Sequence, residues 1–286
     1  MPDPQEFERA ASLLRRTAAV LYSSPSLETQ VSLETMYQAM PQEDKPAVDS
    51  TLKKMERHDL LALPLRGEIV GKTGHGRTIF EQGCIAEVVL GFDFVAKKYE
   101  PAVVHVIVEG TQTQETGGAG FFCADLPGMI VTAAHIAKRR ILRVEDLSGT
   151  TLPSPGKPVI PDGDLDLALL PCEIPAGLEP IRVDWSEDRI SAGSELLLFG
   201  YPKIALHHPS LYQARGQLHT VCPNYTSNRN SLIISRIAHP GCSGGPVMDG
   251  RGFAVGVVEQ ENDLEEATGT NSFVAATPAH YLKKFL

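Results

Sequence analysis

The sequence lacks the features of a disulfide-rich, metal-binding or membrane-spanning protein. Its five cysteines stand at positions 84, 123, 172, 222 and 242, with no Cys-x-x-Cys pair and no cluster with histidine. Neither a disulfide scaffold nor a zinc site follows from this pattern. The N-terminus carries Asp3, Glu6 and Glu8 and no apolar run typical of a signal peptide. No stretch reaches the roughly 18 apolar residues of a membrane-spanning helix. We therefore expect a soluble, cytoplasmic protein with no membrane partner.

Positive charge is also scarce. The chain has 26 Lys and Arg against 35 Asp and Glu, a formal net charge of −9 at pH 7. Such a chain is a poor candidate for binding a phosphate backbone, so no nucleic-acid partner is expected. At roughly 150 residues per domain, 286 residues make one large domain or two ordinary ones. The 25 glycines and 21 prolines suit a turn-rich β protein.

Residues 1–62 have helical character. Apolar residues recur at helical spacing within 5–22, and a last helix is expected at about 46–61. Methionines in this region either fill a small helical core or form an adaptable surface for a partner: Met36, Met40 and Met55. We interpret 1–62 as a helical N-terminal extension. It is either an interaction module, for a protein partner or for self-association, or a fixed brace.

Beyond residue 65 the pattern changes to short apolar runs separated by glycine and proline. The predicted strands are 85–95, 102–108, 128–134, 165–170, 195–199, 231–234 and 253–258. Residues 63–91 are expected to be a connecting β and loop segment, which either joins the first barrel or forms a separate hairpin. Helices first and strands afterwards, without alternation, favour a mainly β barrel or sandwich over a parallel α/β sheet.

A serine between glycines is the strongest chemical motif. The run Gly241-Cys-Ser-Gly-Gly-Pro246 can form a tight turn that exposes the Ser243 hydroxyl and aligns successive N–H groups. Such N–H groups can stabilise the anion that develops when a carbonyl is attacked. The strand-like residues that follow, 253–258, predict a rigid support.

A histidine follows a second strand-like run. Val131-Thr-Ala-Ala-His135 ends in small residues before the imidazole. Because the chain has nine histidines, His135 alone means little.

An aspartate opens a third apolar run. Asp166-Leu-Ala-Leu-Leu170 reads as a buried strand. A carboxylate that enters a core needs a partner, for which a histidine N–H is suitable. Asp162 and Asp164 are expected to face solvent in the preceding turn.

Together these segments resemble the trypsin-like (chymotrypsin-fold) serine peptidases, and most closely the bacterial HtrA/Deg-type protease domains. The resemblance runs from about Phe92 to Ala276. It rests on the following pieces in order: Pro101-Ala-Val-Val, Gly118-Ala-Gly-Phe-Phe, Thr132-Ala-Ala-His135, Asp166-Leu-Ala-Leu-Leu, Gly200-Tyr-Pro, Gly241-Cys-Ser-Gly-Gly-Pro and Gly256-Val-Val. The order His, Asp, Ser is that of this family.

The resemblance implies a two-barrel antiparallel fold over 92–286, with six strands in each barrel. Barrel one would span about 98–172 and barrel two about 193–276, with the site between them. Ser243 would be the nucleophile, His135 the general base and Asp166 the residue that orients it. The N–H groups of Gly241 and Ser243 would form the oxyanion hole. A serine endopeptidase of this kind acts on a polypeptide substrate and needs no metal and no cofactor.

Two departures from secreted members of the family fit the cytoplasmic expectation. Cys242 precedes the serine where secreted members carry an aspartate that pairs with a new N-terminus, and Ile136 stands where they place a disulfide cysteine. Cys242 also raises a cysteine nucleophile as an alternative, although the register of the motif favours Ser243. The chain ends at Leu286, and no PDZ domain is expected.

The expected substrate pocket is formed by two stretches. The resemblance places its walls at 237–240 and 257–261, with Ile237, His239, Val258, Glu259 and Glu261 as pocket residues. No acid stands at Ile237, so selectivity for basic side chains at the cleavage site is not implied. Five of the eight residues 259–266 are acidic, and this loop either is simply solvated or disfavours acidic substrates.

Three functions remain open from the sequence. The first is an active serine endopeptidase. The second is an inactive or latent protease-fold binding module that a partner regulates through the N-terminal helices. The third is a structural or adaptor protein whose helical extension does the work.

Overall fold

The computed structural model describes residues 4–43, 45–63, 69–110, 115–153, 155–161, 165–203, 207–224, 229–235, 237–259 and 273–286. The chain divides into two compact units, Met1–Lys97 and Lys98–Leu286. This division falls six residues after the boundary expected at 91/92. No helix in the described ranges is both long enough and apolar enough to cross a bilayer.

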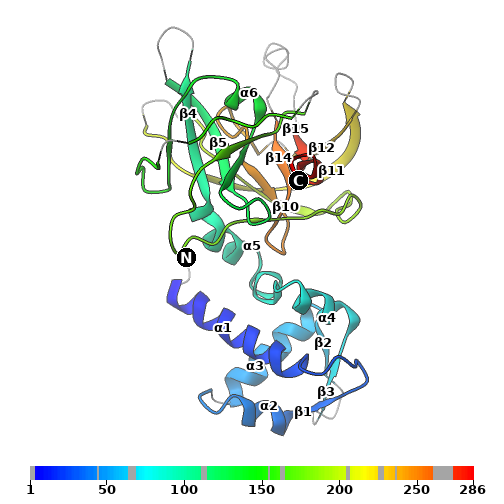
Figure 1. Ribbon diagram of the computed structural model, residues 1–286. Helices are drawn as coiled ribbons and strands as arrows, with labels where there is room; N and C mark the ends of the chain where they lie inside the picture. Colours follow the sequence, from blue (N-terminus) through cyan, green and yellow to red (C-terminus); the bar gives the residue numbers. More distant parts are fainter. Residues whose placement is uncertain are drawn as a thin grey trace. The chain divides into compact units, whose positions relative to one another are not determined.

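The first unit combines helices with a small sheet (Figure 1). Its helices are α1 (Pro4–Leu21), α2 (Leu33–Ala39), α3 (Lys45–Arg57), α4 (Gly74–Glu81) and most of α5 (Ile85–Tyr99). Its strands are β1 (Val31–Ser32), β2 (Leu61–Ala62) and β3 (Ile69–Lys72), with β3 in the middle. The Ser32 hydroxyl caps α2 by accepting a hydrogen bond from the Thr35 N–H.

The methionines of the first unit are core residues. Met36 and Met55 have no exposed surface and Met40 has 1%. They are buried together with Leu14, Leu52 and other apolar side chains of the helices. The structure therefore supports a small helical core at these positions and not an exposed methionine surface.

The prediction of a strand at 85–95 is wrong, because these residues belong to helix α5. A short apolar run with β-branched residues fits a buried helix as well as a strand. Gly91, which has a positive φ of 72°, interrupts this helix. With α4 and α5 present, residues 63–91 are not the predicted β and loop connection.

The second unit begins with a curled five-stranded sheet. Its strands are β4 (Val103–Glu109), β5 (Glu115–Phe122), β6 (Met129–Thr132), β7 (Ile141–Glu145) and β8 (Ala168–Pro171). They pair antiparallel in the order β7-β4-β5-β6-β8. The sheet curls around buried side chains that include Val106, Phe122 and Leu170. Among the described residues this half-barrel has five strands and not the expected six.

Six strands of the second unit close into a barrel. They are β10 (Glu195–Gly200), β11 (Tyr212–Asn224), β12 (Arg229–Ser235), β13 (Pro246–Met248), β14 (Phe253–Val258) and β15 (Phe273–Pro278). The pairing of β13 with β14 closes the ring, and the interior holds Leu198, Leu232, Val247 and Val274. The mainly β, chymotrypsin-like double-barrel architecture predicted from the sequence is confirmed.

The two sheets of the second unit meet where glycines leave no room for a side chain. The Ala119 N–H in β5 donates to the Ser243 carbonyl at 2.8 Å. At Gly244, where φ is +84°, a Cβ atom would lie 2.3 Å from the Ala119 oxygen. The backbone of the serine turn is therefore in direct contact with the half-barrel.

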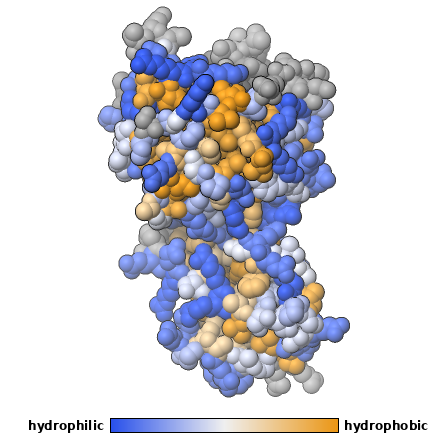
Figure 2. Space-filling view, in the orientation of Figure 1, coloured by the Kyte–Doolittle hydropathy of each residue, from blue (hydrophilic) through white to orange (hydrophobic). Residues whose placement is uncertain are grey.

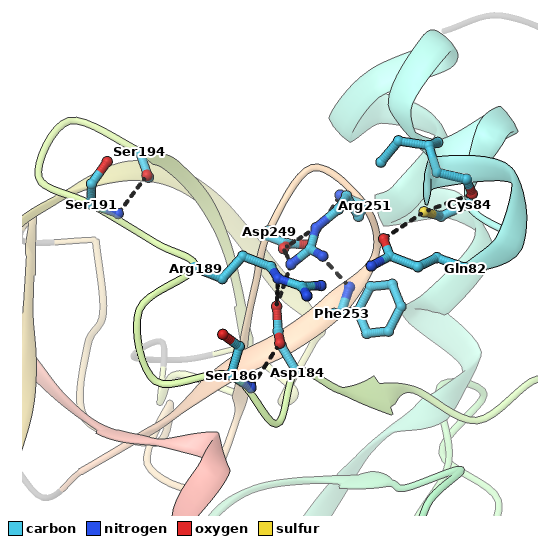
Figure 3. Close-up of polar contacts among 11 residues, drawn as sticks. Gln82, Cys84, Asp184, Ser186, Arg189, Ser191, Ser194, Asp249, Arg251 and Phe253 are labelled. Atoms are coloured by element: carbon cyan, nitrogen blue, oxygen red, sulfur yellow. Dashed lines mark hydrogen bonds and ion pairs between the residues drawn. The ribbon is translucent and has the colours of Figure 1, made fainter. Parts of the chain in front are cut away.

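A buried ion-pair network fastens the connection between the two sheets. The short strand β9 (Arg182–Val183) pairs in parallel with β14. Figure 3 shows Arg251, from the β13–β14 turn, between the carboxylates of Asp184 and Asp249. Arg251 Nε lies 2.8 Å from Asp249 Oδ2. The network ties the connection to the barrel that carries the serine turn.

Apolar residues also appear on the surface of the second unit. Figure 2 shows them on the viewed face among hydrophilic neighbours. The large exposed apolar side chains of this unit include Leu142, Leu147, Val159, Val221 and Phe273. Single exposed apolar residues are common on soluble folds. These residues alone define no functional site.

Candidate active site

His135 lies on a four-residue helix that directly follows a buried strand. Helix α6 (Ala134–Ala137) begins two residues after β6, and its Ala134, Ile136 and Ala137 are buried against the half-barrel core. The imidazole is the side chain of this helix that reaches the surface, with 19% of it exposed. The alanines therefore fix the helix and leave the histidine accessible.

Asp166 holds His135 through two hydrogen bonds. His135 Nδ1 lies 2.7 Å from Asp166 Oδ2, and the His135 N–H donates to Asp166 Oδ1 at 2.9 Å. Because an ionised carboxylate only accepts hydrogen bonds, Nδ1 carries the proton. Nε2 is then the nitrogen that can accept a proton from another group.

Ser243 stands on the turn between β12 and β13. Gly241, with a positive φ of 103°, allows the turn, because a Cβ atom there would lie 2.3 Å from the Tyr201 oxygen. Cys242 is fully buried in the barrel core, whereas Ser243 is partly exposed. The buried thiol is not placed to attack a substrate, so the geometry supports the serine over the cysteine.

Two N–H groups of the serine turn have no acceptor among the described residues. The neighbouring amides are engaged, since Cys242 N–H donates to His239 O and Gly245 N–H to Cys242 O, each at 2.9 Å. Within the described part of the chain, the N–H groups of Gly241 and Ser243 donate to nothing. Unengaged donors on one turn are the arrangement that an oxyanion site requires.

The serine turn lies beside the histidine helix. A Cβ atom at Gly118 would contact both the Ser243 carbonyl, at 2.7 Å, and Ile136, at 2.9 Å. The Ser243 hydroxyl itself donates to the carbonyl of Glu259 at 3.3 Å. Among the contacts of the described residues there is no hydrogen bond from Ser243 to His135. The nucleophile would therefore have to rotate to reach Nε2.

The residues expected to line a substrate pocket do not share one environment. Val258 is buried in the barrel core, and Ile237 packs against the same cluster. His239 is exposed, and its ring packs edge-on against Tyr212 with centroids 5.5 Å apart. The Glu259 side chain points into a polar site that it forms with the hydroxyls of Ser231 and Thr277. Glu261 and the rest of the acidic loop lie outside the described residues, as do Asp162 and Asp164.

A cavity of about 550 Å³ lies beside the oxyanion turn and borders Pro240 and Gly241. The His105 and Tyr201 rings stack within its lining at a centroid distance of 5.0 Å. Burial lowers the pKa of His105, and the Glu145 carboxylate at 3.9 Å offsets this only in part. His105 was not predicted as a site residue, because it lies inside a continuous apolar run.

Comparison with known families identifies this unit. Residues 118–257 match the family model described as the trypsin-like peptidase domain. His135, Asp166 and Ser243 all fall inside the matched segment. The second unit therefore contains a trypsin-like peptidase domain.

A solved structure shares the fold. The chain is similar to the HtrA-type protease AlgW, solved as a serine-to-alanine variant with a tripeptide, with a TM-score of 0.52 at 17% identity. The similarity covers 66% of this chain and 60% of that protease. At this sequence identity the similarity establishes the fold only, and it assigns no role to any single residue. No curated protein matches the chain.

Proposed function

We propose that the protein is a serine endopeptidase that uses Ser243, His135 and Asp166. The observation that carries this proposal is the pair of hydrogen bonds that Asp166 accepts from the ring and the backbone of His135. They fix both the orientation of the imidazole and its tautomer, and so leave Nε2 as a base. A serine on an adjoining glycine turn supplies the nucleophile.

The reaction would proceed by acyl transfer. Ser243 Oγ attacks the carbonyl carbon of a peptide bond while His135 Nε2 takes the hydroxyl proton, and the imidazolium then donates that proton to the leaving amine. Water, deprotonated by the same nitrogen, attacks the acyl-enzyme and releases Ser243. Asp166 stabilises the imidazolium in both halves of the reaction.

The N–H groups of Gly241 and Ser243 would stabilise the tetrahedral intermediate. Since they have no acceptor in the part of the chain that the structure describes, they need not break a hydrogen bond found there to receive the oxyanion. The loss of one such donor typically costs about 10²–10³-fold in kcat. The Pro240 carbonyl accepts from the Lys203 N–H at 3.1 Å, which helps to hold the turn in this orientation.

Substrates with an apolar residue at the cleavage site fit best. Ile237, one of the residues expected at the pocket, is only partly buried and packs against the apolar cluster of the barrel, whereas Val258 is buried inside that cluster and does not face substrate. The polypeptide on the leaving-group side would enter the cavity beside Gly241. Because the acidic loop lies outside the described residues, its preference for basic substrates stays a hypothesis.

A latent enzyme is the second candidate, because the Ser243 hydroxyl is bound to the Glu259 carbonyl. In this alternative, a partner recruited through residues 1–62 would switch the serine toward His135. Addition of a partner protein would then raise the rate of labelling by an active-site reagent. An active enzyme would label at its full rate alone.

A fluorophosphonate tests the proposed nucleophile. We expect it to modify Ser243, and Ser243→Ala to abolish both labelling and peptide hydrolysis. Ser191→Ala, which removes an exposed hydroxyl from a loop, is the matched control and retains both. Hydrolysis that persists in Ser243→Ala would overturn the assignment.

A further inference from the structure

Glu259 contacts the candidate nucleophile with its backbone and the neighbouring strands with its side chain. Its N–H donates to the Ala275 carbonyl at 3.1 Å, and its own carbonyl accepts from the Ser243 hydroxyl at 3.3 Å. Its carboxyl oxygen Oε1 accepts from the hydroxyls of Ser231 and Thr277, each at 3.0 Å. The side chain therefore connects the end of β14 to β15 and β12.

The Glu259 carboxyl lies on the face of the sheet opposite to the barrel core. Val258 and Ala276 are paired across β14 and β15, and both point into that core. Because side chains alternate along a strand, Glu259 and Thr277 point to the other face. Ser231 and Thr277 have only 5% and 4% of their surface exposed, so the carboxyl is anchored in a buried polar site.

Asp166 is the charged group that acts on this carboxyl. The two strands packed against Glu259 present uncharged hydroxyls, from Ser231 and Thr277. Among the described residues, the electrostatic partner of Glu259 is Asp166, which in turn holds His135. Burial raises the pKa of Glu259 and the negative charge of Asp166 raises it further, while the two hydroxyl hydrogen bonds act in the opposite direction. Glu259 is thus coupled electrostatically to the carboxylate that holds His135.

We propose that Glu259 is a positioning residue for the reaction of Ser243, a role that rests on the proposed peptidase function. Its carboxyl, anchored by two buried hydroxyls, fixes the carbonyl at which the Ser243 hydroxyl rests. In its ionised form it also adds negative charge beside Asp166 and so stabilises the protonated imidazole of His135. The sequence suggested only a pocket wall at this position. The hydrogen bonds instead direct its side chain away from substrate.

The charge can be separated from the anchoring by two substitutions. Glu259→Gln keeps a carbonyl oxygen that accepts from both hydroxyls but has no charge. Glu259→Ala removes the charge and leaves two buried hydroxyls without their acceptor. Glu195→Gln, at an exposed carboxylate at the start of β10 in the same barrel, is the matched control.

The pH dependence of fluorophosphonate labelling is the first measurement. The acidic limb of this profile reports the loss of the proton from His135. Removal of a nearby negative charge favours the neutral imidazole, so we expect this limb to move to lower pH by roughly half a pH unit in Glu259→Gln. It should not move in Glu195→Gln. We expect Glu259→Ala to label about tenfold more slowly at the pH plateau, and Glu259→Gln to restore most of that loss.

The second measurement does not depend on activity. NMR titration of His135 in the full chain carrying Ser243→Ala, with and without Glu259→Gln, should give the same downward shift of the imidazole pKa. An unchanged His135 titration would overturn the role of Glu259, whatever the labelling result. A shifted titration in a protein whose wild-type form is not labelled would support the role of Glu259 and refute the peptidase function instead.

Discussion

At the scale of single residues, the central feature is the grip of Asp166 on His135. One carboxylate oxygen accepts from the ring and the other from the backbone of the same residue. The backbone contact fixes the orientation of the carboxylate, and the ring contact then fixes the position of Nδ1 and of its proton. Positioning of this kind contributes to catalysis by reducing the reorganisation needed in the transition state.

Substitution of Asp166 by asparagine tests this grip. The amide is nearly isosteric but presents a donor to Nδ1, which favours the wrong histidine tautomer. We expect kcat for peptide hydrolysis to fall by roughly 10⁴-fold with little change in thermal stability. Asp188→Asn, at an exposed position, should leave kcat unchanged. A loss of less than tenfold in Asp166→Asn would contradict the proposed role.

The raised pKa of Glu259 predicts how the thermal stability of the protein changes with pH. Folding raises its pKa, chiefly through burial. The stability that it contributes is therefore present below the pKa of the unfolded chain and is lost as pH rises through the folded value. The glutamine of the Glu259→Gln variant has no titratable group. As the pH rises from 4 to 8, the thermal stability of wild type should therefore fall relative to that of this variant. Melting curves for both proteins at the two pH values check this, and parallel behaviour would count against it.

At the scale of elements, the serine turn and β5 are in direct contact. The Ala119–Ser243 hydrogen bond joins them, and the close approach at Gly118 and Gly244 prevents either from moving alone. The N–H groups of Gly241 and Ser243, the proposed oxyanion donors, are therefore supported by the half-barrel as well as by the barrel that carries them.

Gly118→Ala tests this support. The new methyl group would lie 2.7 Å from the Ser243 carbonyl, so the turn has to shift. We expect hydrolysis to fall at least tenfold while the protein stays folded by circular dichroism, because the strain acts on the oxyanion site. Gly74→Ala, where a Cβ atom meets nothing within 4 Å, is the control. Full activity in Gly118→Ala would show that the turn is not held from this side.

The ion-pair network around Arg251 makes a separate prediction. Arg251→Ala leaves Asp249 buried without its cation and leaves Asp184 with Arg189 alone, at 3.8 Å, so we expect a loss of roughly 3–5 kcal/mol in the free energy of unfolding. Chemical denaturation, with the exposed Arg139→Ala as the control, measures it. A cost below about 1 kcal/mol, the value of an exposed pair, would contradict the network as drawn.

At the scale of the whole molecule, local sequence patterns predicted the β architecture, whereas the grouping of His135, Asp166 and Ser243 was predicted from the resemblance to the trypsin-like peptidases. Each of the three lies beside a short apolar run, which His135 follows and which Asp166 and Ser243 precede, but such local signals alone do not bring the three residues together. The helix at 85–95 was missed because a buried apolar run has the same composition in a helix and in a strand. The polar site of Glu259 was missed because β12, β14 and β15 approach one another only in the folded barrel.

The boundary between the two units suggests a truncation after Lys97, which the sequence did not predict. The predicted extension ended at residue 62, but contacts divide the chain after Lys97. A chain of residues 98–286 keeps both sheets and every residue of the candidate site. If the site works alone, its fluorophosphonate labelling rate should lie within about threefold of that of the full chain, a difference of under 1 kcal/mol. A strong dependence on the first unit would favour the latent alternative.

The most direct test of the account is mass spectrometry of the full chain after treatment with a fluorophosphonate. We expect one stoichiometric adduct, on Ser243, and we expect both His135→Ala and Ser243→Ala to abolish it. This single result depends on the nucleophile, the base and the oxyanion donors together. A folded protein that carries no adduct, or that carries it on Cys242, would contradict the claim.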